Sequence, residues 1–329
     1  KQKGKQMQQI IIQKNEAGQR LDKFLQKYMP LAPVSFFYKM LRKKNITLNG
    51  KKAEGREKLI ENDCICLFLS EETIGTFREK HSSVSEYEQA FHKLRGIQIL
   101  YEDPNILVMN KPAGILSQKA QPEDLSVNEW LIGYLLSEHQ ITEKELETYK
   151  PSVCNRLDRN TIGLIIGAKT LAGSQKMSAF IRERKVRKFY QAFVDGKLED
   201  SDTIQGYLHK DPKENKVYID RNPLKGDPIE TRYRPLKSYG DKTLLEIELI
   251  TGKPHQIRAH LSSIGHPILG DPKYGSKAAN EIYKKKYGLR SQLLYACRIE
   301  FGREEELFEE LRGRIICAPV PEIFTKLMP

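Results

Sequence analysis

The sequence predicts an α+β protein in two units. A small α/β unit is followed by a larger unit whose mixed or antiparallel β-sheet is flanked by helices. The length of 329 residues suits two domains. Residues 1–70 hold 15 Lys and Arg against 6 Asp and Glu, so this segment accounts for +9 of the net charge of +12. Beyond it, strand-like and helical patterns follow one another without strict βαβ alternation, which is typical of an α+β fold.

Two helices and a hairpin are expected in the small unit. Apolar residues at helical spacing predict a helix over 21–28, and Ser35 is a suitable N-cap for a second helix. A strand over 46–48, the turn Asn49-Gly50 and a closing strand over 65–69 follow. Basic side chains gather at the end of the second helix and in the hairpin, where they can contact a phosphate backbone together. These residues are Arg42, Lys43, Lys44, Lys51 and Lys52.

Residues 18–70 resemble the S4 RNA-binding domain. The matching segments are 20–25, 41–46 and 48–51. The resemblance implies that Arg20 and the five basic residues named above contact RNA. The charge by itself is explained equally well by a solvated basic face. We therefore expect an S4-like RNA-binding domain over 1–70.

Residues 71–95 are polar and mixed in charge, with little periodicity, and we expect them to link the two units. The larger unit, 96–329, follows. Its expected strands are 97–101, 106–109, 164–168, 188–194 and 244–250, and its expected helices begin at a capping box at Ser126 and at residue 171. Residues 197–240 are expected to be rich in loops, with short extended pieces.

The composition excludes several classes of protein. Hydrophobic residues make up 39% and charged residues 30% of the chain, which suits a packed core. Uninterrupted apolar stretches are too short for a transmembrane helix. The five cysteines have no metal-ligand spacing and are expected to be reduced thiols of a cytoplasmic protein that binds no metal.

Charged residues interrupt apolar sequence at two places in the larger unit. Asp158 lies between Arg156 and Arg159 directly before a buried strand, and flanking arginines favour an ionised carboxylate that can act as a nucleophile. Taken alone, a structural ion-pair cluster explains that segment better. His255 and Arg258 lie three residues apart in the first turn of a helix that Pro254 is expected to open, so both can face one site.

A third segment, 186–190, has the pattern of a basic and aromatic strand. Tyr190 in it is either an ordinary core residue or a platform on which a base stacks. A buried charge without a partner would be costly, so we expect Asp158 and Arg258 to meet in one cleft that Tyr190 also lines.

Together these segments resemble the RluA-type pseudouridine synthase family. The matching motifs lie at 110–114, 156–164, 168–170, 188–190, 251–261 and 265–275, and the resemblance covers roughly 95–302. The chain departs from the family pattern at four places. Asn155 and Tyr295 stand where His is frequent, Ile162 where Ser is usual, and Lys253-Pro254 where Arg-Thr is usual.

The resemblance implies the pseudouridine synthase fold and the isomerisation of uridine to pseudouridine in RNA, without cofactor or metal. Asp158 would be the nucleophile, attacking either the ribose C1′ or the uracil ring. Arg258 would pair with Asp158, and Tyr190 would stack on the uracil. The expected substrate-binding residues are Arg156, Lys111, His255, Gln256, Ile257 and Leu294.

Large-subunit (23S) ribosomal RNA is the expected substrate, because the S4-bearing members of the family resemble enzymes that act on it, and transfer RNA is the alternative. A second alternative is a non-catalytic S4-type RNA-binding or ribosome assembly factor, against which the retained Asp158, Tyr190 and Arg258 argue. A glycosidase or nuclease is disfavoured, because no pair of carboxylates and no metal-binding cluster is recognisable. We expect a monomer.

Overall fold

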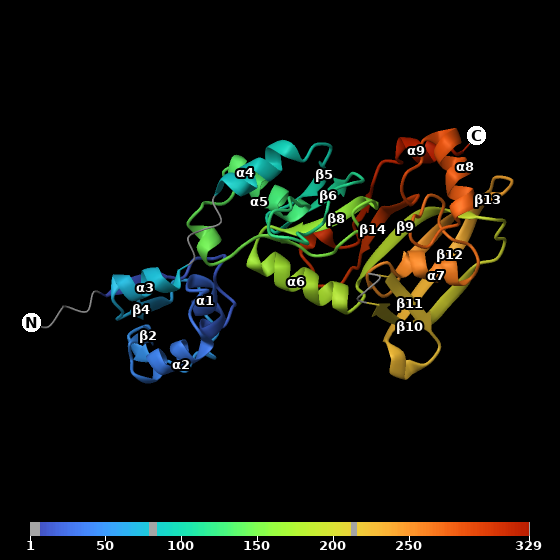
Figure 1. The fold of residues 1–329 in the computed structure, drawn as a ribbon. Helices are drawn as coiled ribbons and strands as arrows, with labels where there is room; N and C mark the ends of the chain where they lie inside the picture. Colours follow the sequence, from blue (N-terminus) through green and yellow to red (C-terminus); the bar gives the residue numbers. More distant parts are fainter. Residues whose placement is uncertain (1–6, 79–83, 212–215, 329) are drawn as a thin grey trace, which may run out of the picture.

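The computed structural model describes residues 7–78, 84–211 and 216–328. They form two β-sheets, and each sheet has its own hydrophobic core and its own helices (Figure 1). The larger sheet combines antiparallel pairs with one parallel pair, between β8 (Ile162–Ala168) and β14 (Leu294–Phe301). The prediction of an α+β fold with a mixed sheet is confirmed.

The N-terminal unit has a four-stranded sheet in the order β1–β4–β2–β3. Its elements are β1 (Gln8–Ile11), α1 (Leu21–Tyr28), α2 (Val34–Arg42), β2 (Ile46–Leu48), β3 (Lys51–Lys52), β4 (Cys64–Leu67) and α3 (Glu71–Phe77). The helix over 21–28 and the hairpin are confirmed. The expected cap is wrong, because α2 begins two residues earlier than Ser35 would allow, with Pro33 at its N-cap. The edge strand β1 was not predicted.

The segment expected to link the two units, 71–95, is largely helical where it is described. Ser70 caps α3 by accepting a hydrogen bond from the Thr73 backbone N–H. Helix α4 (Val84–Lys93) packs on α5 (Val127–Ser137). Ile74 of α3 is buried in the first core, whereas Tyr87 of α4 is buried in the second. The two helices therefore belong to different cores.

The larger sheet has the strand order β11–β10–β12–β13–β9–β14–β8–β6–β5, with β15 beside β14 and β7 beside β8. Its other strands are β5 (Gln98–Glu102), β6 (Ile106–Lys111), β7 (Ser152–Val153), β9 (Val186–Asp195), β10 (Asp202–Asp211), β11 (Lys216–Asp220), β12 (Asp227–Ser238), β13 (Lys242–Leu249) and β15 (Ile315–Cys317). The expectation of a loop-rich segment with only short extended pieces over 197–240 is wrong, because the long strands β10 and β12 pair there in antiparallel register, with β11 beside β10.

Helices cover this sheet at both ends (Figure 1). They are α6 (Leu171–Arg182), α7 (Gln256–Ser263), α8 (Lys277–Tyr287) and α9 (Glu322–Thr325), in addition to α4 and α5. Helix α7 contacts β11 and β12, and a small apolar cluster that includes Ala259 and Tyr274 joins it to β10 and β11. This arrangement holds α7 against the part of the sheet that β10, β11 and β12 form.

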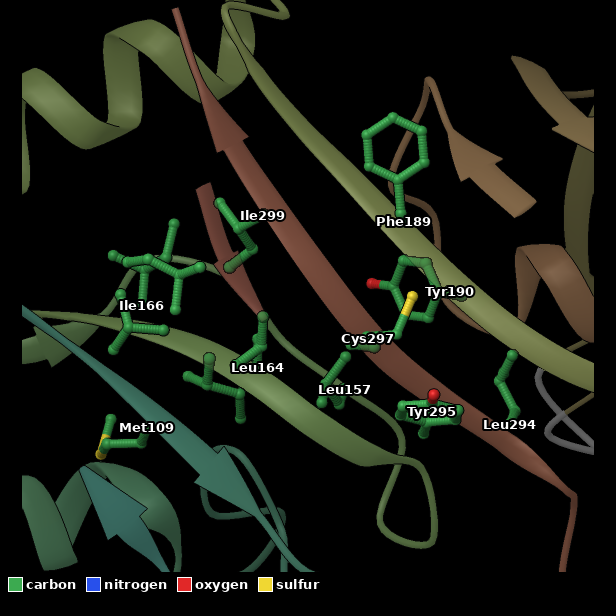
Figure 2. Packing of buried hydrophobic residues seen from close by; sticks show 14 of the residues in the cluster. Met109, Leu157, Leu164, Ile166, Phe189, Tyr190, Leu294, Tyr295, Cys297 and Ile299 are labelled. Carbon is green, nitrogen blue, oxygen red and sulfur yellow. The ribbon is translucent and has the colours of Figure 1, made fainter. Parts of the chain in front are cut away.

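The central strands place Tyr190 at the site. Along β9 successive side chains alternate between the two faces of the sheet. Figure 2 shows Tyr190 pointing toward Cys297 and Leu157, while Phe189 points away on the other face. Gly163 of β8 has φ +114, and a Cβ there would collide with the backbone of Ala296 on β14. Glycine therefore permits the close parallel pairing beside the site.

Candidate active site

Asp158 and Arg258 meet in one cleft, as the sequence predicts. Arg258 Nη1 donates to Asp158 Oδ2 at 2.7 Å, and the two side chains are 7% and 23% exposed. Asp158 comes from the loop between β7 and β8, and Arg258 from the first turn of α7. Tyr190 lines the same cleft. The cleft thus brings together three segments that are distant in the sequence.

A second carboxylate holds Arg258 from the other side. Arg258 Nε and Nη2 donate to the two oxygens of the fully buried Asp271, at 2.7 and 2.8 Å. Asp271 also accepts the backbone N–H groups of Lys273 and Tyr274. Burial disfavours the charge on Asp271, but the bonds from Arg258 outweigh this and hold the pKa of Asp271 below its usual value. Asp271 received no role from the sequence, because it lies in a loop without periodicity.

Arg258 is therefore fixed between two carboxylates. Burial opposes its charge, yet Asp271 and Asp158 together raise the pKa of Arg258 above its usual value. The guanidinium uses its fork on Asp271 and turns its remaining amino group toward Asp158. This geometry orients Asp158 while leaving it partly exposed to the cleft.

Lys111 holds the loop that carries Asp158 by hydrogen bonds to backbone carbonyl groups. The Lys111 side chain is fully buried, and its Nζ donates to the carbonyl oxygens of Pro112, Ile115 and Arg159 at 2.8 to 2.9 Å. Burial lowers the pKa of Lys111 to about 7, an effect that the Asp158 charge opposes. Three carbonyl acceptors match the three N–H bonds of an ammonium group. Lys111, expected to bind substrate, lies outside the lining of the cleft.

The start of α7 differs from the expectation, because the helix begins after His255 rather than at Pro254. His255 has φ +56, in the left-handed region, at a cost of about 1–2 kcal/mol for a residue with a side chain. Its Nδ1 lies 3.0 Å from the hydroxyl of Tyr274, which helps to hold this conformation. Burial lowers the pKa of His255, and the Asp158 charge opposes that effect. His255 lines the cleft as expected.

Gln256 lines the cleft but has no free polar atom. Its Oε1 accepts from Thr251 and from the backbone of Lys253, while its Nε2 donates to the carbonyl of Glu230 and the hydroxyl of Thr231. These four bonds tie the first turn of α7 to β12 and to the loop after β13. The side-chain amide is thus committed to the fold.

Tyr190 presents a buried ring at the cleft. It is 4% exposed, and burial, with a smaller contribution from the Asp158 charge, raises the pKa of Tyr190 above its usual value. Its phenol is therefore protonated at neutral pH. Ile257 and Leu294, both expected to contact substrate, are apolar parts of the same lining, and the exposed Arg156 lies at its edge. Leu249 and Lys253, to which the sequence assigned no role at the site, also line the cleft and are close to the end of β13.

The basic side chains of the N-terminal unit lie on its surface. Arg42, Lys43, Lys44, Lys51 and Lys52 are exposed, and among the described residues none of them has an ion-pair partner. Arg20 differs, because its guanidinium is paired with Asp22 at 2.7 Å, and Asp22 also accepts from Tyr38. The five unpaired cations are available to an anionic partner, whereas Arg20 is engaged within the unit.

The described part of the chain offers neither a metal site nor a membrane span. Across 7–78, 84–211 and 216–328, no three His, Cys, Asp or Glu side chains are placed to hold a metal ion together. In the same ranges, no helix has both the length and the apolar character needed to span a membrane.

The fold and the site define a class of protein: an enzyme with one oriented carboxylate beside an aromatic ring in a cleft at the centre of a mixed sheet. The family model for RNA pseudouridylate synthases matches residues 105–263. Ribosomal large subunit pseudouridine synthase C of Vibrio cholerae is 30% identical over 302 residues, which cover 90% of this chain and 89% of that protein. The protein of the same name from Salmonella typhi is 31% identical over 294 residues, covering 89% and 88%.

Solved structures agree on the fold. Human RNA pseudouridylate synthase domain containing 4 superposes with a TM-score of 0.56 at 24% identity, covering 74% of this chain and 95% of that one. Human RNA pseudouridylate synthase domain containing 1 gives a TM-score of 0.53 at 21% identity, covering 69% and 85%. The chain belongs to the RNA pseudouridine synthase family and is an isomerase that acts on RNA, as its motifs predict.

Proposed function

We propose that this enzyme converts uridines of large-subunit ribosomal RNA to pseudouridine, with Asp158 as the nucleophile. The observation that carries the assignment of the site is the chain Asp158–Arg258–Asp271, in which a buried guanidinium orients one partly exposed carboxylate toward the cleft. The relatives that match nine-tenths of the chain bear the name ribosomal large subunit pseudouridine synthase C. Their names support ribosomal RNA over transfer RNA.

In this mechanism Asp158 attacks the ribose C1′ or the uracil ring, and the bond between C1′ and N1 breaks. The uracil turns, C1′ bonds to C5, and the bond to Asp158 breaks so that the carboxylate is released, after which the proton on C5 is lost and N1 gains one. The Tyr190 ring holds the base face-on during the turn. Because the pKa of Tyr190 is raised, its phenol starts protonated, so it assists the last step by passing a proton on rather than as a free base.

The N-terminal unit, 1–70, supplies contacts to the RNA backbone as an S4-like domain, followed by a connection over 71–95 and the catalytic domain over 96–329. Support comes from the five exposed and unpaired cations Arg42, Lys43, Lys44, Lys51 and Lys52. Contacts of this kind position a protein on RNA without reading its sequence. They help to offset the few kcal/mol needed to take the target uridine out of its stack. We expect a cytoplasmic monomer.

The test is a map of pseudouridines across total RNA from a strain that lacks the gene. One or more sites in large-subunit ribosomal RNA should disappear, and they should return with the wild-type gene but not with Asp158→Asn. Asn keeps the shape of the side chain and removes only the charge. Sites lost from transfer RNA alone would contradict the ribosomal assignment, and an active Asp158→Asn protein would contradict the assignment of the nucleophile.

A further inference from the structure

Lys188 is a cation without a partner beside the cleft. It lies on β9 two residues before Tyr190, so both side chains leave the strand on the same face. Within the described part of the chain, its ammonium group makes no hydrogen bond and no ion pair. Burial lowers the pKa of Lys188, with no contribution from a carboxylate. Its charge is therefore not used to hold Asp158.

Arg187, on the opposite face of the same strand, differs from Lys188 because its charge is paired. Arg187 donates to Glu248 at 2.7 Å and to Glu300 at 2.9 Å, so its charge is balanced by both neighbouring strands. Lys188 instead pairs in register with Ile299 on β14. On the other side of β9, the pairing with β13 ends at Phe189, which lies opposite Glu248. The next residue of β13, beyond this last pair, is the apolar Leu249. A half-buried ammonium among apolar neighbours lowers the stability of the fold.

The loop after β13 brings this ammonium to the edge of the cleft. Leu249 and Lys253 line the cleft, and Gly252 lies between them. The Nζ of Lys188 lies close to Gly252. A Cβ atom built on Gly252 would be 3.6 Å from this Nζ and would have no other described neighbour within 4 Å. The titratable side chains that line the cleft are Arg156, Asp158, Lys253, His255, Arg258 and Tyr190, so Asp158 is its only carboxylate among the described residues, and Arg258 already balances it.

We propose that Lys188 binds a backbone phosphate of the RNA directly beside the target uridine. This rests on the proposed function. Two residues along a strand span about 7 Å. A uracil stacked on Tyr190 is therefore followed, at the position of Lys188, by the sugar–phosphate backbone of the same nucleotide. A lysine ammonium is a compact point charge with three donors, which suits a phosphate oxygen.

The test compares wild type with Lys188→Met, in the full chain, on unmodified large-subunit ribosomal RNA transcripts. Removal of one phosphate contact should lower the slope of log affinity against log salt by about 0.7–0.9 and should weaken binding about tenfold at moderate salt. Lys188→Arg should restore the slope, because it restores the charge. The control is Lys197→Met, which removes an exposed lysine just beyond the end of β9 and should leave the slope unchanged.

Thermal melting supplies a second readout. Methionine has a similar length and removes an unpaired buried charge, so Lys188→Met should melt no lower than wild type. A clearly lower melting temperature would mean that the ammonium stabilises the fold, and it would overturn the proposal. An unchanged salt slope in Lys188→Met would do the same.

The phosphate itself is identified with a synthetic stem-loop that carries the mapped uridine and one neutral methylphosphonate on either side of it. One of these two methylphosphonates should weaken RNA binding by wild type about as much as Lys188→Met does. The same methylphosphonate should not weaken RNA binding by Lys188→Met any further. Additive losses for both positions would overturn the contact. Absence of pseudouridine formation by wild type on ribosomal transcripts would instead overturn the proposed function, and this site with it.

Discussion

Replacing Arg258 by methionine should destabilise the protein by about 3–5 kcal/mol, because it leaves a fully buried carboxylate unpaired. Asp271 is 0% exposed and would lose both guanidinium bonds, at 2.7 and 2.8 Å. It would keep only the backbone N–H groups of Lys273 and Tyr274. At about 2–4 °C per kcal/mol for a domain of this size, the melting temperature should fall by about 6–20 °C.

The Asp158 side of the same guanidinium should be far less sensitive. The Asp158 side chain is 23% exposed and receives one of the three bonds from Arg258. Asp158→Asn therefore leaves Arg258 paired with Asp271 and should cost about 1–2 kcal/mol or less. Both Asp158→Asn and Arg258→Met should abolish pseudouridine formation. Activity and stability are thus expected to separate at the two ends of one ion-pair chain.

Urea unfolding of a double-mutant cycle measures the coupling between Arg258 and Asp271. In Arg258→Met combined with Asp271→Asn the buried charge is gone, while the Asn oxygen still accepts the two backbone N–H groups. The double variant should recover most of the stability lost in Arg258→Met alone. A double variant whose loss equals the sum of the two single losses would refute the reasoning.

Three further predictions concern the ring, the N-terminal charge and a buried histidine. Tyr190→Phe should bind RNA but lose turnover, whereas Tyr190→Leu should also bind RNA more weakly by about 1–3 kcal/mol; RNA titration and tritium release from C5-tritiated uridine separate the two. The five exposed cations of the N-terminal unit can be changed to Gln together: Arg42, Lys43, Lys44, Lys51 and Lys52. The slope of log RNA affinity against log salt concentration should then become shallower by about 0.7–0.9 for each phosphate that is no longer bound. Burial lowers the pKa of His260 from 6.5 to about 4. As the pH falls, the histidine is therefore protonated in the unfolded chain before it is protonated in the folded protein, and the free energy of unfolding should fall by up to about 3 kcal/mol between pH 6.5 and pH 4. Urea unfolding should show this fall in wild type but not in His260→Gln.

Each of these has an outcome that contradicts it. Full turnover by Tyr190→Leu would make the ring ordinary core packing. A salt dependence that survives removal of the five cations would move the RNA contact away from the N-terminal unit. An equal acid-induced loss in His260→Gln would assign it to other groups, and the exposed His139→Gln is the matched control.

Periodic sequence made most of the fold predictable. The helices that became α1, α5 and α6, and the strands that became β6, β8 and β9, have apolar residues at the spacing their burial requires. The contact between Asp158 and Arg258 was predictable for a different reason, because two charges that interrupt apolar sequence need each other. Strands β10 and β12 were missed, because most of their side chains are at least partly exposed; the buried and alternating side chains of β12 are limited to Ile229, Thr231 and Tyr233.

The fate of a charged side chain was the hardest to predict. Lys111 and Lys188 are both lysines next to apolar sequence, yet one ammonium is fully satisfied by three carbonyls and the other has no partner among the described residues. Asp271 pairs with Arg258 across a separation of 13 residues that includes a helix end and a loop. Residue type gives the capacity for these contacts, but only the packed backbone decides which acceptor lies within reach.

The residues that fix the site use their polar atoms on other parts of the protein. Asp271 holds the guanidinium, Lys111 holds the Asp158 loop, and Gln256 holds the first turn of α7, each through several bonds to its surroundings. A site built this way has little freedom to adapt to a uridine that is still stacked. The nucleotide must therefore come to the protein, at a cost of a few kcal/mol for leaving its stack. Phosphate contacts outside the reacting atoms can supply that energy, which is the physical reason to look for them in the N-terminal unit and at Lys188.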